Sequence, residues 1–461
     1  MVTQRQGQKL EVTGSGGDMT GARGYSEYTA QLRQLTTDAA AGRTVQPRRL
    51  LASVDGEASE QLRRLVPLQY RRQVGAFFTP APLKQRVTEL LLRHRANSYL
   101  DPTCGSGDLL LAASNVLPIQ NSLAATLRDW TDRLYGCDIN REFVEAARHR
   151  LFIAALLRHG VARDEQVTSV ETGRYFSNIV VGDGLNSLSK ADSFTGHILL
   201  NPPFGVMSSS LSREWTSKPT STAAIFAYQA VRHLAFGGRL TAILPDVLRS
   251  GSRYQSWRTL VDEICARESI ITYGQFDDHA DVDVFLLNAR RVTPLAEHRP
   301  ATEWWAPEAL PLTGPRIGDY FTIRVGTVVD NRDPTEGPIY PFAKARDLPP
   351  SGEVSLPSGR RKFAGRVFEP PFVLLRRTSR PAKPGQSRVC GVLITGKNPV
   401  AVDNHLIAAL PKDHSIESCR ALLGVLASEP TSEWLDNRIR CRHLTVGAVR
   451  EIPWRDLADF S

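Results

Sequence analysis

The chain has 461 residues, a length that allows two or three domains with substantial cores. Its hydrophobic content of 41% is ordinary for a globular protein, and no apolar run approaches the length of a membrane span, which argues against a membrane protein. The formal net charge is +9 at pH 7, an excess that suits a polyanionic partner.

The beginning of the chain and the cysteines indicate the compartment. Residues 1–24 are polar and Gly-rich and lack the apolar segment of a secretory signal, so we expect a loose tail. The six cysteines show no paired C-x-x-C spacing, which argues against a zinc site and a disulfide framework. We therefore expect a cytoplasmic protein with reduced thiols, no metal and no membrane partner.

Residues 25–75 are predicted to be helical, because leucines recur at helical spacing on either side of a polar break. The segment Phe77-Phe78-Thr79-Pro80 follows. Thr79 precedes a proline and should be extended, while Pro80 and Pro82 are placed to open a helix over 83–93.

The next motif, from Tyr99 to Asp108, is typical of a strand that ends in a tight Gly loop and opens a helix over 109–116. Its glycines let the backbone approach a ligand closely, although many turns also contain glycine. Two acids, Asp101 and Asp108, would repel a phosphate and would suit a ligand with a cationic amine.

Two further strands are predicted to end in acids. Residues 134–140 end at Asp138, and residues 179–184 end at Asp183, with a helix over 142–158 between them. An acid at the end of the second strand is how such folds hold a ribose diol. Each acid could instead cap a helix, but three in succession at strand ends are hard to attribute to caps.

Another predicted strand ends in an amide and two prolines instead of an acid. Its sequence is Ile198-Leu199-Leu200-Asn201-Pro202-Pro203-Phe204-Gly205. The prolines stop the apolar strand and leave Asn201 at its carboxyl end, where open α/β sheets bind ligands. An amide, a rigid corner and an aromatic ring suit a planar group that bears an NH2, although the same letters could form only a loop.

The rest of the chain completes one domain and begins another. A loop over 208–222, a helix over 223–235, a strand over 239–244 and a hairpin of strands 269–276 and 282–288 are predicted. The alternation implies a doubly wound α/β sheet with an antiparallel edge hairpin over 76–293. Residues 294–315 are predicted to form a surface-packed linker, and residues 316–461 a second domain with short strands and a helix over 416–428.

The second domain carries a basic stripe. Between Arg360 and Lys397 there are ten Lys/Arg and one acid, Glu369, so this window alone matches the net excess of the chain. Such a stripe suits nucleic acid, although a solvated loop is the alternative. The predicted contacts are Arg360, Arg361, Lys362, Arg376, Arg377, Arg380 and Lys397.

Together, the motifs of residues 70–290 resemble the amino-methyltransferases of DNA that use S-adenosylmethionine. The order is closest to adenine-N6 methyltransferases whose target-recognition domain follows the catalytic domain, the gamma arrangement. The segment 77–80 matches the motif before the first strand, 101–107 matches the cofactor loop, and 201–204 matches the catalytic tetrapeptide. The C-terminal domain resembles recognition domains of specificity subunits in segments 325–327, 337–340, 347–348 and 443–453.

The resemblance implies a Rossmann-like methyltransferase sheet, a C-terminal mixed α/β recognition domain, and roles for individual residues. The expected catalytic residues are Asn201, Pro202, Pro203 and Phe204. The expected contacts of S-adenosylmethionine are Phe78, Thr79, Asp101, Thr103, Gly105, Gly107, Asp138, Ile139, Asp183, Gly184 and Asn201. Phe276 is a candidate second stacking ring.

The implied function is methyl transfer from S-adenosylmethionine to N6 of an adenine flipped out of duplex DNA. Acceptors on the amine, from Asn201 and Pro202, would free its lone pair, and Phe204 would stack on the base. The implied setting is a restriction–modification or phage-defence system with the nuclease on a separate chain. The alternatives are a cytosine-N4, RNA or protein-glutamine methyltransferase, a non-catalytic DNA-binding subunit that senses the cofactor, and a restriction–modification fusion.

Overall fold

The structure is a computed structural model that describes residues 24–160, 174–188, 193–277, 280, 282–293, 304, 314–378, 387–439 and 444–454. It divides into two compact units, Met1–Ser209 with Lys218–Ala242, and Ser210–Ser217 with Ile243–Ser461. The tail predicted for 1–24 lies almost wholly outside the described residues, as does most of the linker predicted for 294–315. Within the described ranges, no helix combines the length and the apolar character needed to cross a bilayer.

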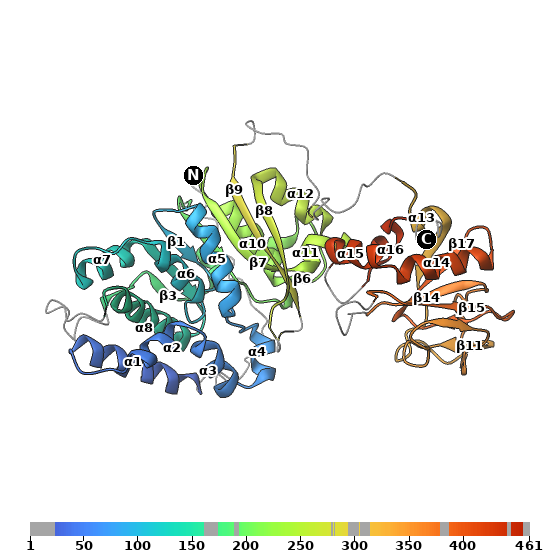
Figure 1. The fold of residues 1–461 in the computed structure, drawn as a ribbon, viewed down its shortest axis with the longest axis horizontal. Helices are drawn as coiled ribbons and strands as arrows, with labels where there is room; N and C mark the ends of the chain where they lie inside the picture. Colours follow the sequence, from blue (N-terminus) through green and yellow to red (C-terminus); the bar gives the residue numbers. More distant parts are fainter. Residues whose placement is uncertain are drawn as a thin grey trace, which may run out of the picture. The chain divides into compact units, whose positions relative to one another are not determined.

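The first unit begins with four helices, as the sequence predicted for residues 25–75. They are α1 (Tyr25–Ala40), α2 (Pro47–Val54), α3 (Glu57–Leu65) and α4 (Leu68–Val74). Tyr25, Tyr28, Leu32 and Leu35 form the buried stripe of α1, which packs against α8 (Arg141–Arg158) (Figure 1). The N-terminal helices are therefore part of the core around α8.

A seven-stranded sheet has the order β3-β2-β1-β4-β7-β9-β8. Adjacent pairs from β3 to β7 are parallel, and β8 runs antiparallel to β9. The predicted doubly wound α/β sheet with an antiparallel edge hairpin is confirmed. The strands are β1 (Tyr99–Asp101), β2 (Leu134–Asp138), β3 (Ile179–Val181), β4 (His197–Leu200), β7 (Arg239–Pro245), β8 (Cys265–Gln275) and β9 (Asp283–Arg291).

Helices connect these strands, four of them (81–93, 108–116, 141–158 and 222–233) where the sequence predicted a helix and the other four without a prediction. They are α5 (Ala81–Arg93), α6 (Asp108–Val116), α7 (Leu123–Arg133), α8, α9 (Gly184–Leu188), α10 (Thr222–His233), α11 (Asp246–Ser250) and α12 (Gln255–Ile264). The stretch expected to be a loop at 208–222 includes a two-residue ribbon, because β5 (Val206–Met207) pairs with β6 (Thr220–Ser221).

The C-terminal part of the second unit contains two further sheets. One has the order β10-β17-β14-β15-β12 and the other the order β13-β11-β16. The elements are α13 (Ile317–Tyr320), β10 (Phe321–Val325), β11 (Ile339–Ala343), β12 (Gly352–Val354), β13 (Gly359–Lys362), β14 (Phe372–Arg376), β15 (Gly391–Ile394), β16 (Ala401–Val402), β17 (Leu406–Pro411), α14 (Ile416–Ala427), α15 (Glu429–Arg438) and α16 (Val446–Glu451).

The larger of these sheets is covered on both faces. Val373 and Leu375 of β14 lie in one core cluster with α14, α15 and α16, while Phe372 and Leu374 lie in another with Phe368 and nearby strands. This alternation is what a strand buried on both sides requires. The region is mixed α/β, as the sequence predicted.

Trp304 is buried, although the sequence predicted a linker on the surface for residues 294–315. Its side chain is 3% exposed, its ring centroid lies 5.3 Å from that of Trp257, and its Nε1 donates a 3.0 Å hydrogen bond to Asp262. An apolar ring with one satisfied donor is a core residue. Trp304 therefore anchors this stretch to α12.

Candidate active site

The predicted cofactor loop and the predicted catalytic segment follow neighbouring strands. β1 pairs with β4 through Leu100 and Ile198, and with β2 through Asp101 and Gly136. These strands are parallel, so their carboxyl ends share one edge of the sheet. The loop after Asp101, the acid Asp138 and the amide Asn201 therefore begin side by side.

The Gly loop requires its glycines for conformation and for close approach. Gly105 has φ +50° and Gly107 has φ +89°, the left-handed region that favours glycine. A Cβ on Gly107 would lie 3.0 Å from that of Ala147 in α8, and one on Gly105 would lie 2.9 Å from the Phe78 ring. The loop is thus held between α8 and the segment that precedes α5.

Asp101 and Asp138 both accept hydrogen bonds from the loop. Asp101 Oδ1 accepts from the Thr103 backbone at 3.0 Å, and Asp138 Oδ2 accepts from the Gly105 backbone at 3.1 Å. Burial raises the pKa of Asp101 to about 7 and that of Asp138 to about 6. Asp138 is half-buried beside this loop and could accept from a ribose hydroxyl, whereas Asp101 is 1% exposed and its contact with the cofactor stays a prediction.

The raised pKa of Asp101 predicts a pH-dependent stability. This carboxyl has an ordinary pKa of 3.8 but about 7 in the folded chain, so the folded state holds its proton longer than the unfolded state. The free energy of unfolding should therefore fall as pH rises from about 4 to about 7. Asp101→Asn removes this loss, and we expect a gain of up to about 4 kcal/mol at pH 8 and little change at pH 4.

Urea denaturation at both pH values measures the effect of Asp101→Asn on unfolding. Asp132→Asn, at an exposed position of α7, is the matched control and should change the free energy of unfolding little at either pH. An equal effect of Asp101→Asn at pH 4 and pH 8 would contradict the titration of this carboxyl.

The role predicted for Asp108 is corrected by a buried arginine. Arg150 of α8 is 0% exposed, and its guanidinium donates to Asp108 Oδ1 at 2.9 Å. The same guanidinium donates to the Ser106 carbonyl at 2.6 Å and to the Ser53 carbonyl at 2.7 Å. Asp108 is therefore paired within the protein, and the ion pair holds the loop rather than attracting a cationic ligand.

Arg150 is the positioning residue that sequence reasoning missed. A signal existed, because Arg150 falls seven residues after Phe143, on the apolar stripe of its helix, where a cation is unusual unless it is paired. Its bond to Ser53 also joins the N-terminal helices to the cofactor loop.

Asn201 is held by the segment that precedes α5. Its Nδ2 donates to Thr79 Oγ1 at 3.0 Å and to the Phe77 carbonyl at 3.3 Å. Gly75, at φ +69°, leaves no room for a Cβ beside Pro203. The predicted motifs at 77–80 and 201–204, more than 120 residues apart, therefore meet at one site.

An aromatic cluster supports the same segment. The Phe78 ring lies 5.0 Å from the Phe143 ring and 5.8 Å from the Tyr25 ring, measured between centroids. Phe78 is 8% exposed and also faces the Gly loop. Residues from α1, α8 and the segment before α5 thus fix one wall of the site.

The remaining predicted residues of the site differ in exposure. Ile139 is 69% exposed and Asp183 is exposed at the end of β3, while Thr103 and Phe204 are half-buried and Gly184 and Pro202 are buried. Asp183 Oδ1 accepts from the Leu185 backbone at 2.9 Å, the turn contact that the alternative interpretation foresaw. Gly184 lies against the Pro102 carbonyl, where a Cβ would overlap it.

Phe276 does not present an open ring. It lies just after β8 and its side chain is 2% exposed, so both faces of the ring are covered. A stacking role would require a neighbour to move, and the role stays a prediction.

Three arginines of the basic stripe are bonded within the protein. Arg361 pairs with Asp330 and has a side chain 8% exposed, Arg376 donates to the Leu348 carbonyl at 2.6 Å, and Arg377 donates to the Asn404 carbonyl at 3.0 Å. These guanidiniums tie loops of their own unit, which explains why the three residues are only partly exposed. Arg380 lies outside the described residues, and Arg360, Lys362 and Lys397 are exposed, although Arg360 also donates to the Pro357 carbonyl at 2.9 Å and to the Gly359 carbonyl at 3.0 Å.

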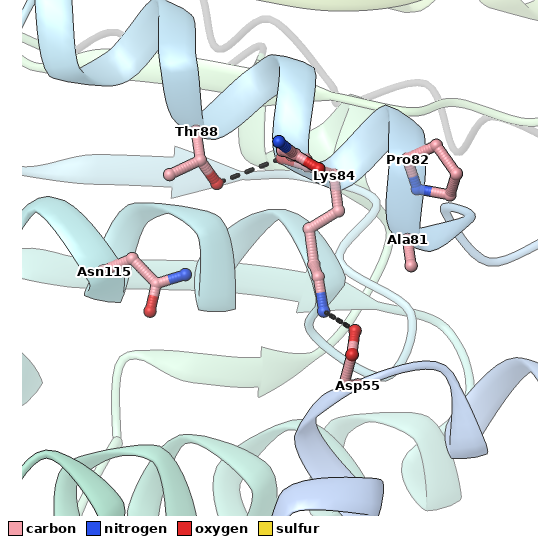
Figure 2. Close-up of a pocket in the computed structure, with 7 residues that line it drawn as sticks. Asp55, Ala81, Pro82, Lys84, Thr88 and Asn115 are labelled. Atoms are coloured by element: carbon pink, nitrogen blue, oxygen red, sulfur yellow. Dashed lines mark hydrogen bonds and ion pairs between the residues drawn. The ribbon is translucent and has the colours of Figure 1, made fainter.

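A separate pocket of about 380 Å³ lies beside α5 (Figure 2). Its lining includes none of the predicted site residues, and Lys84 projects across it toward Asp55, with an Nζ–Oδ1 distance of 3.2 Å. Lys84 Nζ also donates to the Val54 carbonyl at 2.9 Å. The lysine therefore ties the start of α5 to the end of α2. Among the described residues, no group of three or more His, Cys, Asp or Glu could hold a metal ion.

The sheet order and the loop after β1 define a Rossmann-like methyltransferase fold, as the sequence predicted. Residues 54–275, just under half of the chain, match the family described as N-6 DNA Methylase.

One curated relative matches part of the chain. A type II restriction enzyme and methyltransferase, RM.BcgI of Heyndrickxia coagulans, is 27% identical over 174 residues, which are 38% of this chain and 24% of that protein. The match thus spans about a quarter of the curated relative.

Two solved structures are distant neighbours. A methyltransferase subunit of a type I restriction–modification system from Streptococcus thermophilus is 19% identical, with a TM-score of 0.32, over 52% of this chain and 50% of that one. The type IIL restriction–modification enzyme MmeI in complex with DNA is 12% identical, with a TM-score of 0.48, over 89% of this chain and 68% of that one.

Proposed function

We propose that this protein transfers a methyl group from S-adenosylmethionine to N6 of an adenine in duplex DNA, as the modification enzyme of a restriction–modification or phage-defence system. The observation that carries the proposal is the amide of Asn201, oriented by Thr79 and Phe77 next to the glycine loop. The match of residues 54–275 to the N-6 DNA methylase family supports the same substrate.

The residues of the site suit this chemistry. When bound, S-adenosylmethionine supplies an electrophilic methyl group on a sulfonium. An adenine amine is a weak nucleophile because its lone pair is delocalised into the ring. Asn201 Oδ1 and the Pro202 carbonyl would accept its two hydrogens, and Phe204 would stack on the ring. Because an amine inside a duplex cannot reach these groups, the base would be flipped out.

Labelled-methyl incorporation into duplex DNA, followed by methylation-aware sequencing of the product, tests the function. We expect labelled N6-methyladenine at one short sequence. Labelled cytosine would move the activity to cytosine-N4. Label only in RNA or protein, or no label with any substrate, would overturn the proposal.

The DNA-binding surface is narrower than the sequence suggested. Successive side chains of β13 point to opposite faces of the sheet. Arg360 and Lys362 therefore share the exposed face, while Arg361 points to the other side. Lys362 pairs with Ile339 of β11, which is 65% exposed. This open face of the small sheet is the proposed phosphate contact, and exposed Lys397 belongs to the same stripe.

Neutralising this face should weaken binding through counterion release. Arg360→Gln with Lys362→Gln should lower DNA affinity about 10-fold or more at 100 mM salt and reduce the salt slope by roughly 2. Fluorescence anisotropy across a salt series measures both. The matched control is Lys412→Gln with Arg420→Gln, which removes the same charge elsewhere in the domain. A double variant that keeps the slope of the wild type would show that DNA binds at another face.

A further inference from the structure

The hydrogen bonds of Asn201 show how one end of its amide is selected. Both bonds come from Nδ2, and one acceptor is the backbone carbonyl of Phe77. A carbonyl accepts but cannot donate. A flipped amide would place Oδ1 against this carbonyl oxygen, an arrangement of two acceptors that is unfavourable. The Phe77 carbonyl therefore favours the orientation in which Nδ2 faces this carbonyl and Oδ1 faces away from it.

Thr79 completes the orientation. Its Oγ1 accepts from Nδ2 at 3.0 Å, shorter than the 3.3 Å bond to Phe77, and its side chain is 5% exposed. Pro80 is the N-cap of α5, and a proline at this position disfavours a helical conformation at Thr79. The hydroxyl therefore has little freedom to move away from Asn201.

We infer that Thr79 is a positioning residue for the methyl-transfer step, acting through Asn201 rather than mainly as a contact of the cofactor. This inference rests on the proposed function. With Nδ2 occupied, Oδ1 is the end of the amide available to a reacting group, so the site selects a substrate that donates hydrogens, such as an exocyclic amine. An Asn201 amide that could flip would present its Nδ2 donor to the substrate for part of the time. In that orientation it could not accept a hydrogen from the amine.

Thr79→Val and Thr79→Ser separate the two roles. Valine keeps the shape of threonine but removes the acceptor, while serine keeps it. If Thr79 acts through Asn201, Thr79→Val should lower kcat by about 10- to 100-fold and leave the Kd of S-adenosylmethionine within about twofold. Thr79→Ser should recover most of the kcat. Thr88→Val, on the helix α5 that follows Thr79 and outside the site, is the matched control and should retain the kcat of the wild type.

Single-turnover methylation gives the rate, and isothermal titration calorimetry gives the Kd of S-adenosylmethionine without turnover. A weaker Kd with unchanged kcat in Thr79→Val would overturn the inference and return Thr79 to the cofactor. An inactive wild type would instead contradict the proposed function.

Crystal structures of the wild type and both variants decide the inference independently of activity. We expect the Asn201 side chain to leave its position in Thr79→Val and to keep it in Thr79→Ser. An Asn201 side chain that stays in place without the hydroxyl would show that Thr79 does not position it.

Discussion

Asn201→Ala should abolish detectable methylation of DNA while binding of S-adenosylmethionine is kept. The substitution removes the acceptor that would draw the amine toward a tetrahedral nitrogen, and we expect kcat to fall by roughly 10²- to 10³-fold or more. The loop at Gly105 and Gly107 is held by Phe78 and by α8, not by Asn201. The cofactor should therefore still bind with a Kd within about threefold of that of the wild type.

The measurement pairs labelled-methyl incorporation with calorimetry on the same preparations. Asn115→Ala is the matched control. It makes the same substitution at an exposed position of α6 outside the site, so the variant should retain methyl incorporation. Unchanged incorporation in Asn201→Ala would remove Asn201 from catalysis. Loss of both incorporation and cofactor binding would show that the amide is a contact of the cofactor.

The sequence predicts most of the sheet because the relevant signals are local. Apolar runs followed by acids or prolines mark the ends of β1, β2, β3 and β4 within a few residues. Parallel strands bring those ends to one edge, so Asp101, Asp138 and Asn201 could be grouped before any coordinates were known. The sequence also predicted a loop of close approach at Gly105 and Gly107, and the positive φ of both glycines is a finding of the structure.

The contacts that fix the site are long-range, and local patterns do not encode them. Thr79 and Asn201 are joined by a hydrogen bond across 122 positions, and Arg150 reaches Ser53 across 97. A cation within a helix usually lies on a solvated face, so the residue type of Arg150 does not by itself indicate a buried, paired side chain. Conversely, composition placed Arg376 and Arg377 among the predicted DNA contacts, and it could not show that both guanidiniums donate to backbone carbonyls of other segments.

Arg150→Met should cause the largest loss of stability in the first unit. It leaves Asp108, which is 6% exposed, as a buried carboxylate without its ion pair, and such a change costs about 3–5 kcal/mol. The carbonyls of Ser53 and Ser106 lose their donor at the same time. We expect the midpoint of unfolding to move to a clearly lower urea concentration. We also expect the Kd of S-adenosylmethionine to rise about 10-fold, because the glycine loop is no longer held.

Arg141→Met is the matched control for this loss. Arg141 is exposed at the first turn of the same helix, so its substitution should move the urea midpoint little. Equal midpoints for Arg150→Met and Arg141→Met would contradict the role of the buried ion pair.

A double variant separates the charge from the carbonyl contacts. Asp108→Asn combined with Arg150→Met removes the unpaired carboxylate but restores no donor to Ser53 or Ser106. If the buried charge dominates, the double variant should recover more than half of the stability lost in Arg150→Met, because a buried pair replaced on both sides costs less than one broken on one side. If the bonds to the loop dominate, stability and cofactor affinity should both stay low. Recovery of stability without recovery of affinity would show that Arg150 shapes the loop through Ser106 and stabilises the fold through Asp108.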